Sequence, residues 1–252
     1  MDPNSQADLT ALLRAWPHEP GRVNVRIIAG DDGRPKIQVR VELGILQFEM
    51  TGRPDGLRPE GHESVLDMVR ERERQQRVSS SPERFVLSTD DCAALREESV
   101  QYYHRYVALF VLEDFQGVVR DTTRNLELFA FCHRYGESQQ DREVLEQFRP
   151  YVIMMRTRAQ ASLAMRGGQT RVALAAIDTG LDELRRAFED RGQADRFEQA
   201  SEVQVLHGLR DMLVPKLPSS QRLELEERLR AAITAENYEL AAILRDELRM
   251  ME

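Results

Sequence analysis

The chain has 252 residues and a formal net charge of −8, with 41% hydrophobic and 31% charged residues. This hydrophobic share is enough to build buried cores, which excludes wholesale disorder. The acidic balance argues against a protein that coats nucleic acid, because such a surface would be basic. No apolar run approaches the ~18 residues of a membrane span, and the polar start of the chain lacks the order of a signal peptide. We therefore expect a cytoplasmic protein that does not bind membranes.

The sequence contains two cysteines, Cys92 and Cys132. This number excludes a framework of several disulfides and a zinc cage made of cysteines, and it fits a reducing compartment. Cys132 and the adjacent His133 are a candidate pair for thiol chemistry, but a helical cysteine between Phe129 and Tyr135 is more often a small buried apolar residue. We expect neither a metal nor a cofactor.

The N-terminal third predicts a short helix followed by strands. Apolar residues follow a helical spacing over 9–16. Alternation over about 22–50 then predicts a β-hairpin with one long, bent strand, and the change of parity after Gly44 predicts a bulge there. A second helix is expected from about His62. Residues 1–77 are thus predicted to form a small α+β module.

After a Ser/Pro-rich linker at 78–82, the sequence predicts only helices. Ser88 to Asp91 is typical of a helix start, and a break is expected at Glu113-Asp114. Three further helices are predicted over 141–165, 170–189 and 194–213. We expect residues 83–216 to form an α-helical scaffold, so that the fold class is α+β but mostly α.

Two segments of this scaffold match each other at the same spacing. They begin at Phe115 and Thr170, which are 55 residues apart. The matching positions are Val118 with Ala173, Thr122 with Ile177, Asn125 with Gly180 and Leu126 with Leu181. The pattern resembles the turn and second helix of tetratricopeptide repeats, which implies paired helices stacked into a curved scaffold. Those repeats have a period of ~34 residues, so an ordinary helix bundle is the alternative.

Residues 217–252 are predicted to form an antiparallel helical hairpin. Each helix carries apolar residues at i, i+4 and i+8, which predicts a leucine seam between the two. The seam residues are Leu225, Leu229, Ile233, Leu240, Leu244 and Leu248. A hairpin of this size buries little apolar surface by itself, so we expect it to dock on another surface.

The segment from Asn237 to Leu248, with the sequence NYELAAILRDEL, resembles the UVR motif. This helical hairpin is shared by the bacterial nucleotide-excision-repair subunits B and C, by Clp-family chaperone subunits and by the activator of the protein-arginine kinase. Tyr238 stands where Phe is more common. In these relatives the motif implies protein docking rather than catalysis. The resemblance makes candidate docking residues of Tyr238, Glu239, Ala241, Ala242, Arg245 and Asp246.

These observations predict a non-enzymatic adaptor that docks through its C-terminal hairpin. The resemblance suggests four partners: an excision-repair subunit, a Clp-type ATPase, an arginine kinase or a second copy of the chain, with a role in DNA repair or in the stress response. The sequence contains neither a phosphate-binding GxxxxGK[ST] loop nor paired CxxC motifs. Residues 219–252 carry five arginines and eight acidic residues, a net charge of −3, which disfavours direct contact with DNA.

Two other functions use the N-terminal module. The first is a hydrolase or a small-anion-binding regulator, in which two guanidinium groups clamp an anion and an imidazole beside a carboxylate exchanges protons. Its residues are Arg53, Asp55, Arg58, Glu60 and His62, which are equally consistent with a solvated turn. The second is DNA binding by basic residues of the strands, namely Arg22, Arg26, Arg34, Lys36 and Arg40. The 8 basic and 9 acidic residues within 1–60 argue against it.

Overall fold

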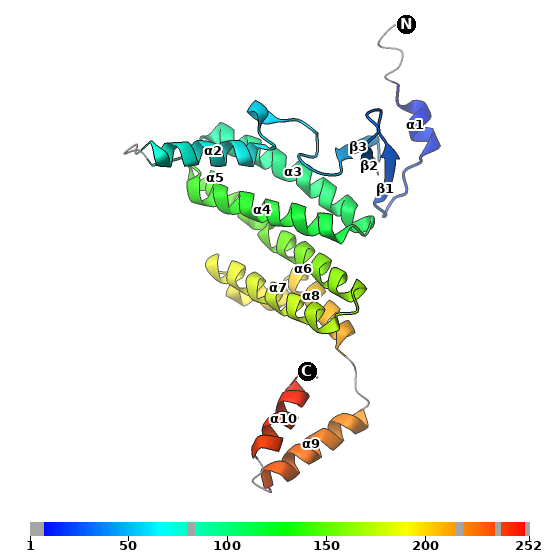
Figure 1. Ribbon diagram of the computed structural model, residues 1–252, viewed down its shortest axis with the longest axis vertical. Coiled ribbons are helices and arrows are strands. Elements are labelled where there is room, and N and C mark those ends of the chain that lie inside the picture. Colours follow the sequence, from blue (N-terminus) through cyan, green and yellow to red (C-terminus); the bar gives the residue numbers. More distant parts are fainter. Residues whose placement is uncertain (1–7, 80–83, 215–218, 235–237, 250–252) are drawn as a thin grey trace.

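The computed structural model describes residues 8–79, 84–214, 219–234 and 238–249. A small antiparallel sheet near the N-terminus is followed by a stack of helices and then by a pair of helices at the C-terminal end (Figure 1). This confirms the predicted α+β, mostly α, fold class. Within the described ranges, no helix combines the length and the apolar content that a transmembrane segment requires.

The first part of the chain holds the sheet. Its elements are α1 (Thr10–Ala15), β1 (Asn24–Ala29), β2 (Pro35–Val41), β3 (Gly44–Glu49), η1 (Pro59–Gly61) and α2 (Val65–Val78). The helical stack follows. It consists of α3 (Thr89–Val111), α4 (Phe115–Tyr135), α5 (Gln139–Glu143), η2 (Glu146–Phe148), α6 (Arg149–Arg166), α7 (Thr170–Asp190), η3 (Ala194–Gln199) and α8 (Ser201–Leu213). The last two helices are α9 (Ser219–Thr234) and α10 (Tyr238–Arg249).

The sheet has three strands in the order β1-β2-β3, so the predicted bulge at Gly44 is wrong. Val41 pairs with Gly44 across β2 and β3, which leaves residues 42 and 43 as a two-residue hairpin turn. The parity of the apolar residues changes because the chain reverses at this point, not because a strand bends. Two-residue hairpin turns usually contain Gly, Asn or Asp, and Glu42 and Leu43 are none of these. A turn at this position could therefore not be predicted from the sequence.

One face of the sheet packs against α3. Cross-strand pairing places Ile37 beside Phe48 and Val39 beside Leu46, so their side chains share this face. The His104 ring of α3 stacks on Phe48, with the ring centroids 6.5 Å apart. The buried apolar residues of the sheet, α2 and the helical stack form one continuous cluster. The predicted modules 1–77 and 83–216 therefore pack directly on each other.

Several predicted helix boundaries are confirmed, while two predicted helices are divided. Ser88 caps α3 through a capping box with Asp91, and the chain breaks between α3 and α4 as expected. The predicted helix over 141–165 is interrupted, because α6 begins next to Pro150, which lacks an N–H and favours the first turn. Extended backbone at Ala200 likewise separates η3 from α8 within the predicted 194–213 helix.

The two matching segments occupy equivalent places in the stack. Each begins a 21-residue helix, α4 at Phe115 and α7 at Thr170. Both helices bury the same matching positions, namely Val118 and Ala173, Thr122 and Ile177, Asn125 and Gly180, and Leu126 and Leu181. This agreement supports an internal repeat, whereas the resemblance to tetratricopeptide repeats stays a prediction.

Candidate functional site

The C-terminal hairpin has a small apolar core of its own. Ala232 of α9 and Ala241 and Leu244 of α10 are buried between the two helices, and Leu225 and Leu229 pack against them. This cluster is separate from the main core of the molecule, and Figure 1 shows the two helices as a distinct pair after α8. The small alanine side chains permit the close approach of the helices that the sequence indicated.

The seam between the helices differs from the predicted one in its last position on α9. Ile233 is 52% exposed, while Ala232 takes its place in the seam, so the prediction for Ile233 is wrong. A helix advances by 100° per residue, and residue i+7 therefore returns to within about 20° of residue i, while residue i+8 is about 80° away. Leu225, Leu229 and Ala232 follow the i, i+4, i+7 rule.

The same geometry places apolar side chains on the outside of the hairpin. On α10 the seam holds Ala241 and Leu244, whereas Leu240 and Ile243 are 39% and 59% exposed. The prediction of Leu240 as a seam residue is therefore also wrong. Leu240 and Ile243 are three residues apart and share one helix face. They lie in the first two turns of α10, and Ile233 lies at the end of α9.

The remaining predicted docking residues are only partly described. Ala242 and Leu248 are half-buried, and Arg245 is exposed on α10. The side chains of Tyr238, Glu239 and Asp246 lie outside the described part of the structure. Their predicted roles in docking stay predictions.

Comparison with protein families finds the UvrB/uvrC motif at residues 220–252, which are the residues of this hairpin. The chain carries a UVR motif. The resemblance predicted from the sequence is thereby confirmed for the hairpin. No curated protein and no solved structure matches the chain.

The loop proposed as an anion site borders an open hollow of about 830 Å³ beside the sheet. Of the five predicted residues, Arg53 and Arg58 line the hollow, whereas Asp55, Glu60 and His62 do not. Arg53 is also held by carboxylates, at 3.2 Å from Asp55 and 3.5 Å from Glu98. The loop therefore does not gather the predicted acid–base groups around one cavity.

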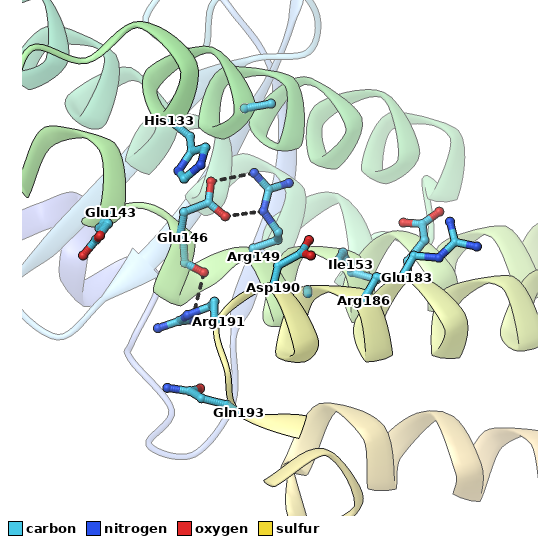
Figure 2. Close-up of a pocket in the computed structure, with 12 residues that line it drawn as sticks. His133, Glu143, Glu146, Arg149, Ile153, Glu183, Arg186, Asp190, Arg191 and Gln193 are labelled. Carbon is cyan, nitrogen blue, oxygen red and sulfur yellow. Dashed lines mark hydrogen bonds and ion pairs between the residues drawn. The ribbon is translucent and has the colours of Figure 1, made fainter. Parts of the chain in front are cut away.

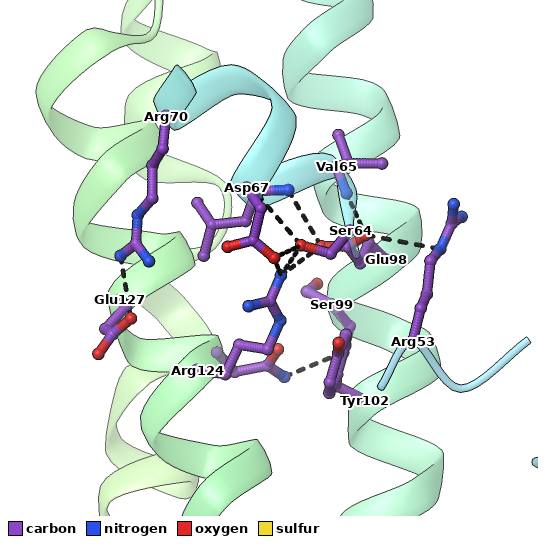
Figure 3. A network of polar contacts seen from close by, with 12 residues as sticks. Arg53, Ser64, Val65, Asp67, Arg70, Glu98, Ser99, Tyr102, Arg124 and Glu127 are labelled. Carbon is purple, nitrogen blue, oxygen red and sulfur yellow. Dashed lines mark hydrogen bonds and ion pairs between the residues drawn. The ribbon is translucent and has the colours of Figure 1, made fainter. Parts of the chain in front are cut away.

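Glu98 of α3 is the centre of a buried polar network that the sequence did not reveal (Figure 3). Its carboxylate accepts hydrogen bonds from the backbone N–H groups of Val65 at 2.7 Å and Leu66 at 3.3 Å, at the start of α2. Arg124 of α4 donates to it at 3.2 Å. The helix dipole favours a negative charge at this place. Glu98 therefore fixes α2 on α3 and α4.

The network extends to the chain that leaves the sheet. Tyr102 donates its hydroxyl to the Gly52 carbonyl at 3.3 Å, and Arg120 donates to the Met50 carbonyl at 3.1 Å. Burial raises the pKa of Tyr102, so its phenol stays protonated as this donor requires. These contacts hold the loop between β3 and α2 on the helical stack, and they indicate a structural role for the network.

A second open hollow, of about 770 Å³, is bordered by the end of α4, the start of α6 and the end of α7 (Figure 2). Arg149 and Glu146 face each other there in a bidentate pair, with contacts of 2.5 and 2.6 Å. Arg191 donates to the Glu146 carbonyl at 3.2 Å. Arg149 and Glu146 thus neutralise each other, and the described residues contain no group of three or more potential metal ligands.

Most basic residues proposed for DNA binding have contacts within the N-terminal module. These contacts join Arg22 to Glu19, Arg26 to Gln38, Lys36 to Asp32, and Arg40 to the Trp16 carbonyl. The Arg26 guanidinium also lies over the Trp16 ring, 4.0 Å from its centroid. Arg26, Lys36 and Arg40 therefore have partners within the module, whereas the Arg22 side chain is 80% exposed. These contacts give no support to a DNA-binding surface.

Proposed function

We propose that the protein is a non-enzymatic adaptor, acting in the cytoplasm, that binds a protein partner through its C-terminal hairpin. The UVR motif at residues 220–252 is the observation on which the proposal rests. That motif is a docking element in the excision-repair and Clp-associated proteins that it resembles.

The geometry of the hairpin supports this proposal. A core of three small or medium side chains stabilises the helix pair only weakly. Outside the seam, Ile233 and Ile243 remain more than half exposed. Burial of apolar side chains of this size against a partner is worth roughly 1.5–3 kcal/mol each when complete. The hairpin therefore offers both a shape and an apolar face for helix-on-helix recognition.

The acidic charge of the hairpin favours a basic partner surface. Residues 219–252 have a net charge of −3, which repels nucleic acid and attracts a surface rich in Lys and Arg. The candidate partners are an excision-repair subunit, a Clp-type ATPase, a protein-arginine kinase and a second copy of the chain. The identity of the partner decides between a role in DNA repair and a role in the stress response.

The test is binding of the purified full-length chain to each purified candidate, measured by interferometry, with sedimentation velocity for self-association. We expect one candidate to bind, and we expect a chain that ends at residue 214 to lose the interaction. Ile243→Asp should weaken binding at least tenfold, because it places a charge on the apolar face.

Val172→Asp on α7 is the matched control, since Val172 is also an exposed apolar side chain but lies far from the hairpin in the sequence. It should leave the affinity unchanged. Equal binding by the full-length chain and the chain that ends at 214 would contradict the proposal, as would equal losses in the Ile243 and Val172 variants.

A further inference from the structure

Cys92 and Cys132, the two cysteines of the chain, meet inside the helical stack. Cys92 is the fourth residue of α3, and Cys132 is the fourth residue from the end of α4. The short turn between the helices makes them antiparallel neighbours, so these two ends lie together (Figure 1). Each cysteine is 1% exposed, and both belong to the same buried core. Asn125 of α4 donates to the Ser99 carbonyl of α3 at 3.0 Å, and Cys132 and Cys92 lie seven residues, or two helical turns, further along the same faces of these antiparallel helices. Two sulfur atoms on facing helices are therefore in position to react with one another.

Backbone contacts hold these helix ends in place. The Leu87 N–H donates to the Tyr135 carbonyl at 2.8 Å, and the Glu137 N–H donates to the Leu87 carbonyl at 3.2 Å. The chain just before α3 is thereby tied to the chain just after α4. The approach of the two thiols is consequently part of the packing of the stack and does not depend on a mobile loop.

The two thiols lie in opposite electrostatic surroundings. Cys92 is in the first turn of its helix, where the helix dipole stabilises a thiolate, and Arg96 follows one turn later, although its guanidinium is shared with Asp141 at 3.0 Å. Cys132 is at the negative end of α4, where a thiolate is disfavoured. The neighbouring Cys132 thiol lowers the pKa of Cys92, and the Cys92 thiol together with burial raises the pKa of Cys132.

We propose that Cys92 and Cys132 are a reversible dithiol–disulfide pair that reacts with small hydroperoxides and cross-links α3 to α4. The Cys92 thiolate attacks one oxygen of hydrogen peroxide, which breaks the O–O bond, forms a sulfenic acid and releases hydroxide, which a proton converts to water. The Cys132 sulfur then attacks the sulfenic sulfur, forms the S–S bond and expels a second water as its own proton leaves. The two thiols are oxidised by two electrons, and one peroxide is reduced to two waters.

The disulfide would close the loop that contains nearly all of α3 and α4, including the residues that hold the sheet. Closing a loop of this length restricts the unfolded chain and stabilises the folded one. We expect the oxidised protein to melt about 5–10 °C higher than the reduced protein. A cellular thiol reductant would reverse the change by exchange.

The test uses the full-length protein, reduced and then exposed to hydrogen peroxide under native conditions. After denaturation with N-ethylmaleimide, the reduced protein should carry two labels. The oxidised protein should carry none, should have lost two hydrogen atoms by intact mass, and should give a linked peptide pair containing Cys92 and Cys132. Dithiothreitol should restore both labels.

Single variants distinguish the two roles. In Cys132→Ser, dimedone should trap a sulfenic acid at Cys92, whereas in Cys92→Ser the remaining thiol should react at least tenfold more slowly. The proposal is overturned if the wild-type protein keeps both thiols after treatment, or if oxidation yields disulfides between chains or sulfinic acids in place of the internal link. The wild-type measurement decides the matter even if a variant fails to fold.

Discussion

Arg105 of α3 and Asp121 of α4 form a bidentate ion pair that is completely buried. The Arg105 Nε lies 2.7 Å from one carboxylate oxygen of Asp121, and a terminal guanidinium nitrogen lies 2.9 Å from the other. Arg105 also donates to the Glu49 carbonyl at the end of β3, at 3.1 Å. A single guanidinium thus joins the two helices and the sheet.

The first prediction is that breaking this pair strongly destabilises the protein. Asp121→Ala leaves the Arg105 charge buried without its carboxylate, which costs about 3–5 kcal/mol of unfolding free energy. Arg105→Met combined with Asp121→Leu removes both charges and should recover most of this loss. Urea unfolding followed by circular dichroism measures both variants.

An exposed pair provides the control for this prediction. Arg74 and Glu71 on α2 are 2.8 Å apart, and the Arg74 side chain is largely exposed. Arg74→Gln should change the stability by less than about 1 kcal/mol, because surface ion pairs contribute little. A similar loss of unfolding free energy in Arg74→Gln and Asp121→Ala would show that burial does not increase the contribution of the Arg105–Asp121 pair to stability.

The sequence could not reveal such buried charges. Charged residues are rarely buried, so Glu98, Arg105 and Asp121 would be expected on exposed helix faces. Their burial depends on partners that are distant in the sequence, such as the backbone N–H groups of α2 that donate hydrogen bonds to Glu98. Hydrophobic spacing describes one helix at a time and contains no information about these partners.

Helix boundaries were easier to predict than buried charges, because a cap or a break depends on the residue types beside it. The Ser88 cap and the break before Phe115 could be predicted because their signals lie within a few residues of the boundary. The hairpin was also recognised, but its seam was misplaced at Ile233, because i+4 spacing was extended over two turns of a helix with 3.6 residues per turn. Such errors of rotation grow with helix length.

The second prediction concerns the contact between Gly180 of α7 and Thr157 of α6. A Cβ at position 180 would lie 2.1 Å from the Thr157 Oγ1, so the two helices could not keep their present approach. Gly180→Ala should lower the unfolding free energy by about 1–3 kcal/mol, despite the better helix propensity of alanine. The cost should shrink in a Thr157→Ala background, which removes the Oγ1 and Cγ2 atoms nearest to the new methyl group.

Gly208 of α8 is the matched control, because no atom other than those of its chain neighbours and its own helix backbone lies within 4 Å of a Cβ built at that position. Gly208→Ala should stabilise the protein by about 0.5–1 kcal/mol, since alanine loses less backbone entropy in a helix. Thermal unfolding of the two alanine variants should therefore move in opposite directions. Stabilisation by Gly180→Ala would refute the predicted clash.

The third prediction concerns pH. Burial between the sheet and the helices lowers the pKa of His104 below its usual value of 6.5. As the pH falls, the unfolded chain binds the proton first, so the contribution of His104 to stability is complete above about pH 7 and decreases as the pH drops through 6.5 towards the lowered pKa. His104→Phe keeps an aromatic ring on Phe48 and should lose less stability between about pH 7.5 and pH 5. Parallel losses in the two proteins, in urea titrations at both pH values, would count against this assignment.

The last prediction compares two adjacent residues of the hairpin. Leu244 is buried in the seam between α9 and α10, whereas Ile243 points outward. Leu244→Ala should cost the hairpin about 2–3 kcal/mol, which is a large share of the stability of so small a unit. Amide hydrogen exchange over 219–249 should accelerate strongly while exchange in α3 and α4 stays unchanged, because the two cores are separate. Ile243→Ala should leave exchange in the hairpin nearly unchanged and should instead weaken partner binding. If both substitutions accelerated exchange equally, the orientation of α10 against α9 would be different from the one described, and with it the face that the hairpin offers to a partner.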